Sequence, residues 1–444
     1  MNSDPNKSLE VGDNEAADAG WIQTAFRFVQ VRPDERVPFS WACVWFATLL
    51  GGYYMVRPVR DALGSVGGGK ELNWLFSAVF ITMLIVVPLY SQLVSRFRRR
   101  IFVPIVYRFL MSHLLLFALA LKFLDASLQL YVARVFFVWV SVYVLFAMSL
   151  FWSVMADSFS SDQGKRLFGI IAGCGTMGAL LGSAFAGYVA KPIGIANLLL
   201  FPALLMEIGL WCYRRLEASR TESQVAAQQL ATGGNPFAGF LHVLKSPYLL
   251  SICGYILLTA LCGTSLYLTQ ANILNETYPD PDARVAVFAW IDFSVQSLTV
   301  ALQLIVAGYL MKFSLPLTLA VLPTMYLLSF VALGFYPTFW AIVPAVVVTR
   351  AVVYGITVPA QGVLFTVVSR EDKYKAKNVI DTVVTRGGDA VVGQLRDQLK
   401  TAGVAMSVVS WAMVPVAVIW VGLAWMLGCN GLKRAGQQSV TSAE

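Results

Sequence analysis

The stretch "LEASRTESQVAAQQLATGGN", from Leu216 to Asn235, is the polar interruption that divides this chain into two parts. Its Gln, Ser, Ala and Gly residues are typical of a linker. On both sides of it, apolar runs recur that are about 20 residues long, the length that a helix needs to span a bilayer. Six such runs precede the linker and six follow it.

The predicted spans cover residues 38–57, 72–95, 102–123, 130–158, 166–190, 195–214, 247–272, 284–311, 315–335, 337–368, 376–403 and 405–428. Only 13% of the 444 residues are charged and 57% are hydrophobic, whereas soluble domains carry about 25% charged residues. Short segments of alternating polarity, which mark outer-membrane barrels, are not found. The sequence therefore predicts an all-α integral membrane protein with twelve transmembrane helices in two six-helix halves.

Five regions follow from this pattern, and two short amphipathic segments introduce the halves. Trp21–Arg32 and Asn235–Lys245 each place aromatic residues on one side and polar or basic groups on the other, as interfacial helices do. We expect a cytoplasmic N-terminus with an interfacial helix (1–37), an N-terminal half (38–214), a cytoplasmic linker with an interfacial helix (215–246), a C-terminal half (247–428) and a cytoplasmic tail (429–444).

The net charge of +8 reflects membrane topology rather than a nucleic-acid partner. If both termini face the cytoplasm, the cytoplasmic segments hold 21 Lys and Arg residues and the opposite segments hold 7. This bias agrees with the positive-inside rule. The first twenty residues are polar and lack the apolar core of a signal peptide. We expect a multi-pass protein of a bacterial inner membrane, with both termini cytoplasmic and the lipid bilayer as its surroundings.

The six-plus-six arrangement resembles the plan of the major facilitator superfamily, whose halves rock around a site near the membrane midplane. The loop after the second span, "SQLVSRFRRR" (Ser91–Arg100), resembles the signature GxLaDRxGRR of that superfamily at Leu93, Arg96, Arg99 and Arg100. The fifth span is rich in glycine, including Gly178 and Gly182. Such small residues let helices approach closely, and the run also resembles an exchanger motif, so packing and a mechanistic hinge are the two interpretations.

A P-loop pattern is present but lacks its context. Gly64 to Lys70 matches GxxxxGK, but Glu71 follows where Ser or Thr would bind magnesium. A membrane span precedes it instead of a strand, so we interpret it as a hairpin between two spans. The six cysteines and two histidines show no metal-ligand or disulfide spacing. No nucleophile stands beside a base. We therefore expect no enzyme, no metal and no cofactor.

Two polar stripes run along predicted spans. In span ten the stripe consists of Arg350, Tyr354, Thr357 and Gln361, and in span eight of Asp292, Gln296, Thr299 and Gln303. At about 100° per residue, each set falls on one helix face. A lipid-facing surface does not hold such stripes, because intramembrane charges are costly. They face a water-filled cavity or pair with each other as structural contacts.

Span eleven is the most polar predicted span, with Asp381, Arg386, Asp389, Arg396 and Asp397 on about half of its circumference. Pairs at i, i+4 and i, i+3, such as Arg386 and Asp389, can interact within one helix. Arg396 and Asp397 lie towards the non-cytoplasmic end. We hypothesise that they meet Arg57, Arg60 and Asp61 at the end of span one and form an outer gate.

Span four contributes Arg134, Ser141 and Trp152 on one face. At its cytoplasmic end, Asp157 either forms a latch with Lys165 or Arg166 or is simply solvated in the loop. Arginine offers a planar fork to phosphate or carboxylate, and aromatic rings stack on bases. These residues favour an anionic organic solute over a cation or a hydrophobic drug, although the aspartates are equally suited to carry protons.

The candidate substrate-binding residues are Arg60, Arg134, Asp292, Gln296, Arg350, Tyr354, Gln361 and Arg386. The candidate gate or coupling residues are Arg57, Asp61, Asp157, Asp381, Asp389, Arg396 and Asp397.

Three segments together resemble the bacterial and plastid ATP:ADP translocase family: "MVRPVRDALG" (55–64), "FWSVMADSFSSDQGKRLFG" (151–169) and "KNVIDTVVTRGGDAVVG" (377–393). The resemblance implies a nucleotide exchanger with a major-facilitator fold. The basic residue of the family at the end of span one falls on Arg60. Exchangers carry a glutamate eleven residues before the Phe that corresponds to Phe151, and this chain has Val140 there.

We therefore expect a monomeric secondary transporter that moves an anionic solute by alternating access, with nucleotides or other phosphorylated compounds as candidates and NTP/NDP exchange as one mode. One alternative is a proton-coupled facilitator for another small molecule, and another is a membrane sensor or scaffold without transport.

Overall fold

The computed structural model describes residues 31–65, 68–97, 99–219, 246–364 and 383–441, and in these ranges every regular element is a helix. The N-terminal part contains η1 (Pro33–Glu35), α2 (Arg36–Gly64), α3 (Gly68–Arg96), α4 (Arg99–Phe123), α5 (Ala126–Ser158), α6 (Ser161–Leu198) and α7 (Leu200–Ala218). The C-terminal part contains α10 (Pro247–Thr277), α11 (Pro281–Leu302), η3 (Gln303–Ala307), α12 (Gly308–Phe313), α13 (Leu315–Phe335), α14 (Phe339–Val352), η4 (Val353–Thr357), α15 (Val358–Leu364), α17 (Thr385–Thr401) and α18 (Met406–Thr441).

The predicted fold class is confirmed, and each predicted span corresponds to a helix or to a run of consecutive helices. Within the described ranges, nine helices are long and apolar enough to cross a membrane. The remaining spans are α3, α7 and α17. The apolar part of α3 that the structure describes is Trp74–Tyr90. The helix α17 carries five charged residues, which lower its hydropathy, and it packs against α3 and α10.

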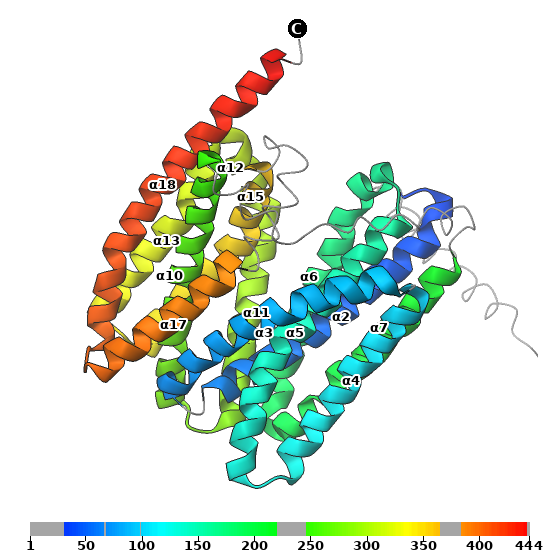
Figure 1. Cartoon of the computed structure of the whole chain (residues 1–444), viewed down its shortest axis with the longest axis horizontal. Helices are drawn as coiled ribbons and strands as arrows, with labels where there is room; N and C mark the ends of the chain where they lie inside the picture. The colour runs from blue at the N-terminus through cyan, green and yellow to red at the C-terminus, as the bar shows by residue number, and fades with distance from the viewer. Residues whose placement is uncertain (1–30, 66–67, 98, 220–245, 365–382, 442–444) are drawn as a thin grey trace, which may run out of the picture.

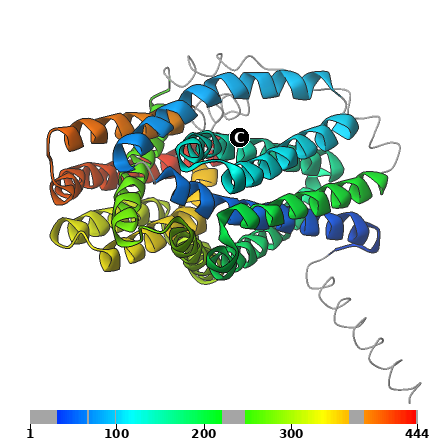
Figure 2. The same ribbon diagram turned by 90° about the horizontal axis from the view of Figure 1, so that it is seen from below.

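The two halves lie side by side (Figure 1), with the C-terminal half in green to red on the left and the N-terminal half in blue to green on the right. The view from below shows the same division (Figure 2). We call the end of the bundle where α7 ends and α10 begins the linker side. The predicted interfacial segments Trp21–Arg32 and Asn235–Lys245 lie outside the described residues, apart from Val31 and Arg32.

Helix boundaries follow from capping residues that the chain places between its apolar runs. Ser160 and Gln163 form a capping box at the start of α6, in which each side chain accepts a hydrogen bond from the other residue's backbone N–H. The side chain of Asp280 caps α11 by accepting hydrogen bonds from the backbone N–H groups of Asp282 and Ala283, and Pro281 follows at the first helical position. Gly194, with φ of 76°, breaks the end of α6 in a conformation that favours glycine.

The helix α2 continues seven residues beyond the end of predicted span one, as far as Gly64. It includes Pro58, a residue type that is tolerated within transmembrane helices. The charged residues Arg57, Arg60 and Asp61 therefore stand on a helix and not on a loop. Because α3 begins at Gly68, helices flank the GxxxxGK pattern on both sides, which excludes a P-loop.

Two spans of the C-terminal half contain π-helical turns, η3 between α11 and α12 and η4 between α14 and α15. The side-chain amide of Gln303 in η3 donates to the backbone oxygen of Tyr354 in η4 at 3.3 Å. The two irregular turns therefore lie against each other. Such turns occur often at functional sites, and here one of them carries a predicted substrate-binding residue.

Polar contacts between the halves lie towards the end opposite the linker side. Gln394 of α17 donates to Ser77 of α3 at 2.8 Å, and the carboxylate of Asp282 in α11 accepts from the backbone N–H of Ile195 in α6 at 3.0 Å. The side chains of Tyr188 and Trp290 pack edge to face, with ring centroids 4.7 Å apart. The structure is therefore closed at this end.

The glycines of α6 bring this helix against α2. A Cβ added at Gly178 would lie 2.7 Å from the Cα of Ala47, and one added at Gly182 would lie 2.9 Å from the Cα of Gly51. Neither position has room for a side chain, because the opposing atoms belong to the backbone. The small residues of span five thus serve close packing, which is the first of the two interpretations drawn from the sequence.

We predict that Gly178→Val and Gly182→Val each destabilise the protein by about 1–3 kcal/mol, because the added methyl groups must push α2 away from α6. The measurement is the thermal unfolding midpoint of purified protein in detergent. Gly173→Val is the matched control, since an added Cβ at Gly173 meets nothing within 4 Å. Equal stability of all three variants would contradict the role assigned to these glycines.

Candidate functional site

A cavity of about 290 Å³ lies between the two halves. Its lining comes from α2, α3 and α5 of the N-terminal half and from α10, α13, α14, η4 and α17 of the C-terminal half. The residues are Arg57, Arg60, Phe76, Val79, Phe137, Ser141, Thr259, Ala260, Gly263, Thr264, Tyr267, Tyr326, Arg350, Val353, Tyr354, Arg386 and Asp389. Because both halves contribute side chains, any change in their relative position changes this cavity.

Four arginines reach the cavity from three helices: Arg57 and Arg60 from α2, Arg350 from α14 and Arg386 from α17. Arg57 and Arg60 are three residues apart, so they project from neighbouring positions on one face of α2. Arg57 is only 9% exposed. Four guanidinium groups around one small cavity inside a membrane bundle are costly unless they are paired or serve a ligand.

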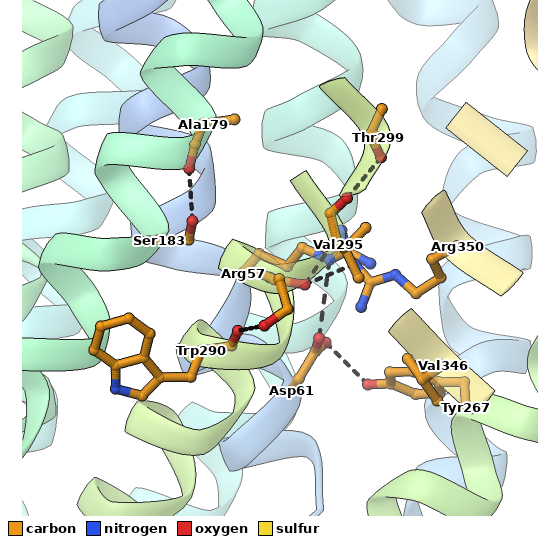
Figure 3. A network of polar contacts seen from close by, with 12 residues as sticks. Arg57, Asp61, Ala179, Ser183, Tyr267, Trp290, Val295, Thr299, Val346 and Arg350 are labelled. Carbon is orange, nitrogen blue, oxygen red and sulfur yellow. Dashed lines mark hydrogen bonds and ion pairs between the residues drawn. The ribbon is translucent and has the colours of Figure 1, made fainter. Parts of the chain in front are cut away.

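Asp61 pairs with both arginines of α2. Its Oδ1 accepts hydrogen bonds from Arg60 Nη2 at 2.6 Å and from the hydroxyl of Tyr267 at 2.9 Å. Its Oδ2 lies 3.9 Å from Arg57 Nε. Figure 3 shows Asp61 between Arg57 and Tyr267. Since Tyr267 belongs to α10, this buried carboxylate connects the two halves.

Asp292 of α11, in the C-terminal half, is a second buried carboxylate that connects the two halves. Its Oδ1 accepts a hydrogen bond from Arg350 Nη2 at 2.7 Å and lies 3.8 Å from Arg57 Nη1. The residue is 1% exposed. Arg57 therefore stands between two carboxylates, one from each half.

Asp389 is the acidic residue that lines the cavity directly. It accepts hydrogen bonds from Thr264 of α10 and from Arg386 Nη1, the latter at 3.4 Å. The predicted i, i+3 pair of Arg386 and Asp389 is therefore present. The side chain of Arg386 is 37% exposed and that of Asp389 is 12% exposed, so part of the Arg386 side chain is open at the cavity.

Aromatic rings form the rest of the lining. The guanidinium carbon of Arg60 lies 5.3 Å from the ring centroid of Phe137, within the range of a cation–π contact. Phe76 and Tyr267, from opposite halves, pack edge to face with centroids 5.7 Å apart. Phe76, Phe137 and Tyr326 were not among the sequence-based candidates, because aromatic residues are frequent in all spans and nothing in their spacing marks these three.

The two predicted stripes face each other across α11 and α14, but only one reaches the cavity. In span ten, Arg350 and Tyr354 line it, while Thr357 is buried and Gln361 is not part of the lining. In span eight, Asp292, Gln296 and Thr299 are 5% exposed or less. Asp292 pairs with the cavity residue Arg350, and the hydroxyl of Thr299 donates to the backbone oxygen of Val295. Gln296 and Gln361 do not line the cavity, and their role in substrate binding stays a prediction.

In this structure, Arg396 and Asp61 have other partners than the ones expected for an outer gate. Arg396 Nη1 donates to the backbone oxygen of Ser265 at 2.6 Å and to the hydroxyl of Thr269 at 2.7 Å. It thus holds α17 to α10 within one half, and Asp61 pairs with Arg60 and Tyr267 instead of with span eleven. The backbone oxygen of Asp397 accepts from the Thr401 hydroxyl.

Two further candidates lie away from the cavity, and one cannot be placed. Arg134 lines an apolar groove of about 680 Å³ between α3, α4 and α5, with its guanidinium over the ring of Tyr131. Asp157 is half-buried at the linker-side end of α5, and Arg166 pairs with Glu35 at 2.7 Å. The latch between Asp157 and a basic residue stays a prediction. Asp381 lies outside the described residues.

The sequence model of the Major Facilitator Superfamily matches residues 38–377. The chain belongs to this superfamily. The match runs from α2 across the linker into the second half, in agreement with the arrangement of the helices. No protein of curated function matches the sequence.

Solved structures of similar fold include several transporters. A POT family transporter in complex with 5-aminolevulinic acid has a TM-score of 0.61 at 10% identity, over 89% of this chain and 96% of that chain. A bacterial homologue of the iron transporter ferroportin, in an inward-facing state, has a TM-score of 0.59 at 10% identity, over 89% and 98%. A mutant of the nucleoside transporter NupG has a TM-score of 0.51 at 14% identity, over 90% and 98%. These identities show a shared fold alone.

We predict that Asp292→Asn lowers the stability of the purified protein by about 3 kcal/mol or more, because it leaves the guanidinium groups of Arg57 and Arg350 without this buried carboxylate. The thermal unfolding midpoint measures the effect. Glu276→Gln, a change of the same type at an exposed position on α10, is the control and should leave the midpoint unchanged. A neutral effect of Asp292→Asn would show that the pair contributes little.

Proposed function

We propose that this superfamily member is a secondary transporter of the inner membrane that moves an anionic, phosphorylated solute by alternating access. The observation that carries the proposal is the convergence of Arg57, Arg60, Arg350 and Arg386 on one cavity between the halves. Arginine binds phosphate and carboxylate oxygens through two parallel hydrogen bonds. A cationic substrate would be repelled by the same groups.

The charge balance around the cavity supports an anion. The four arginines are accompanied by three aspartates, Asp61, Asp292 and Asp389, which leaves one positive charge in excess. Among the described residues, Nε of Arg57 and Nε of Arg350 are buried and donate to no protein acceptor. Unused donors beside an excess positive charge fit a ligand that supplies anionic oxygen atoms.

Nucleotides are the specific candidates that the resemblance to ATP:ADP translocases suggests. The aromatic rings of Phe76, Phe137 and Tyr267 provide faces on which a base can stack. The position where exchangers carry a glutamate is Val140, which is fully buried in the hydrophobic core, whereas its neighbour Ser141 lines the cavity. The missing carboxylate would therefore not have faced the bound solute directly in this conformation.

The positions of the contacts between the halves support alternating access. The contacts between Asp61 and Tyr267 and between Arg57 and Asp292 join the halves beside the cavity, and the contacts of α17 with α3 and of α6 with α11 close the end opposite the linker side. We propose that the linker side is cytoplasmic, as the distribution of basic residues indicates. The structure then corresponds to a state closed towards the outside. Rocking of the halves would open this end and close the cytoplasmic end.

Proton coupling is the second candidate function, and Asp389 is the observation that favours it. This carboxylate lines the cavity and is bound to Arg386 and Thr264. Its protonation would release Arg386, and its deprotonation would bind it again. A carboxylate that competes with substrate for one arginine is suited to couple proton and solute movement.

The deciding experiment uses purified protein in liposomes loaded with ADP, and follows the entry of labelled ATP with and without a proton gradient. If the protein is an exchanger, entry of labelled ATP should require internal ADP and should not depend on the proton gradient. Entry driven by the gradient into empty liposomes would instead establish the coupled mechanism. If ATP and ADP do not enter at all while another phosphorylated metabolite does, the anion site stands and the nucleotide assignment fails.

We predict that Arg386→Gln lowers the transport rate at least tenfold, because it removes the most open guanidinium of the cavity. Since this group is only part-buried, the variant should fold, which is checked by its thermal unfolding midpoint. Arg108→Gln, which removes a half-exposed arginine paired with Glu207 away from the cavity, should transport at the wild-type rate. Wild-type transport by Arg386→Gln would refute the anion site.

A further inference from the structure

Cys43 of α2 and Cys174 of α6 lie opposite each other where these helices run side by side. The register is set by three other pairs along the same interface: Arg166 with Glu35, Gly178 with Ala47, and Gly182 with Gly51. In each of these pairs the two residues are 131 apart in the sequence. Cys43 and Cys174 have the same separation, so the parallel register places them on the same line, one helical turn before Ala47 and Gly178.

The two thiols lie close enough to interact with each other. Both residues are partly exposed, and neither takes part in a disulfide. Of the other cysteines, Cys212, Cys253 and Cys262 are buried and Cys429 is partly exposed on α18. The pair therefore combines two features that oxidation to a disulfide requires, namely proximity of the two thiols and partial exposure to an oxidant.

Close packing of α2 against α6 does not by itself require thiols at the turn of Cys43 and Cys174. At the next turn, Ala47 and Gly178 bring the two backbones so close that an added Cβ would clash, and any small residue would fit the neighbouring turn. A disulfide requires that its two Cα atoms lie within about 7 Å, and from the close approach one turn away we infer that Cys43 and Cys174 meet this condition. Two thiols at this position therefore add redox reactivity to an interface that close packing already forms.

We propose that Cys43 and Cys174 are a reversible redox site, at which a hydroperoxide converts the two thiols into a disulfide that joins α2 to α6. One thiolate attacks the peroxide oxygen, which gives a sulfenic acid and releases the alcohol. The second thiol attacks the sulfenic sulfur, forms the S–S bond and releases water. Two electrons pass from the sulfur atoms to the O–O bond, and a dithiol reductant reverses the reaction.

The consequence for the molecule follows from the position of the bond. Both helices belong to the N-terminal half, so the disulfide leaves the movement of one half against the other free. It instead fixes α2, which carries Arg57 and Arg60, against its main neighbour. A bond that closes a long loop restricts the unfolded chain, and we expect the oxidised protein to be more heat-stable while its transport continues.

The test treats purified wild-type protein in detergent with tert-butyl hydroperoxide. We expect the loss of two of the six thiols, a non-reduced peptide that links Cys43 to Cys174 by mass spectrometry, recovery with dithiothreitol, and a thermal unfolding midpoint several degrees higher. Cys43→Ala and Cys174→Ala should abolish both the link and the rise. Cys429→Ser, which removes a partly exposed cysteine elsewhere, should retain both.

Several results would overturn the proposal. Oxidation of Cys43 or Cys174 to sulfinic acid without a link would show that the sulfur atoms cannot reach bonding geometry. A link from either residue to another cysteine, or between two molecules, would show that the pair is not the site. A complete link without a rise in the unfolding midpoint would refute the stabilising role. None of these readouts depends on the identity of the transported solute.

Discussion

The carboxylate of Asp292 is the charge on which the centre of this protein depends. It is almost completely buried, it binds Arg350 of its own half directly, and it lies close to Arg57 of the other half. A buried charge of this kind is tolerated only with partners, so it fixes the relative positions of α2, α11 and α14. The cavity with its four arginines exists because these helices are held at this distance.

The close contact of α2 with α6 supplies the rigid frame behind these charges. Glycines at the interface remove the side chains that would separate the backbones, and dispersion contacts over the whole interface take their place. The arginines of α2 are therefore presented from a helix that moves with its half as one body. Such rigidity allows a small rotation between halves to change the distances across the cavity.

In the proposed function, the same arginines have two tasks. Without solute they neutralise Asp61, Asp292 and Asp389, and with an anion bound they divide their hydrogen bonds between the anion and these carboxylates. Because the contacts of Asp61 and Asp292 also join the halves, binding of an anion would weaken the connection between them. Competition for a limited number of guanidinium donors thus links solute binding to movement of the halves.

The sequence by itself determined the fold class, because the length and number of apolar runs are set by the thickness of a bilayer and not by long-range contacts. It also identified Arg57, Arg60, Asp61, Arg350, Tyr354, Arg386 and Asp389 as candidates, since charged or polar residues within apolar runs are rare and stand out.

Only the tertiary structure decided the partners of these residues. Arg396 pairs with α10 and not with α2, Arg134 lies at an apolar groove, and the stripe of α11 is buried, because helix periodicity gives the face on which a residue lies but not which helix packs against that face. The aromatic lining and the opposition of Cys43 to Cys174 depend on the register between helices far apart in the chain, which is set by packing between backbones.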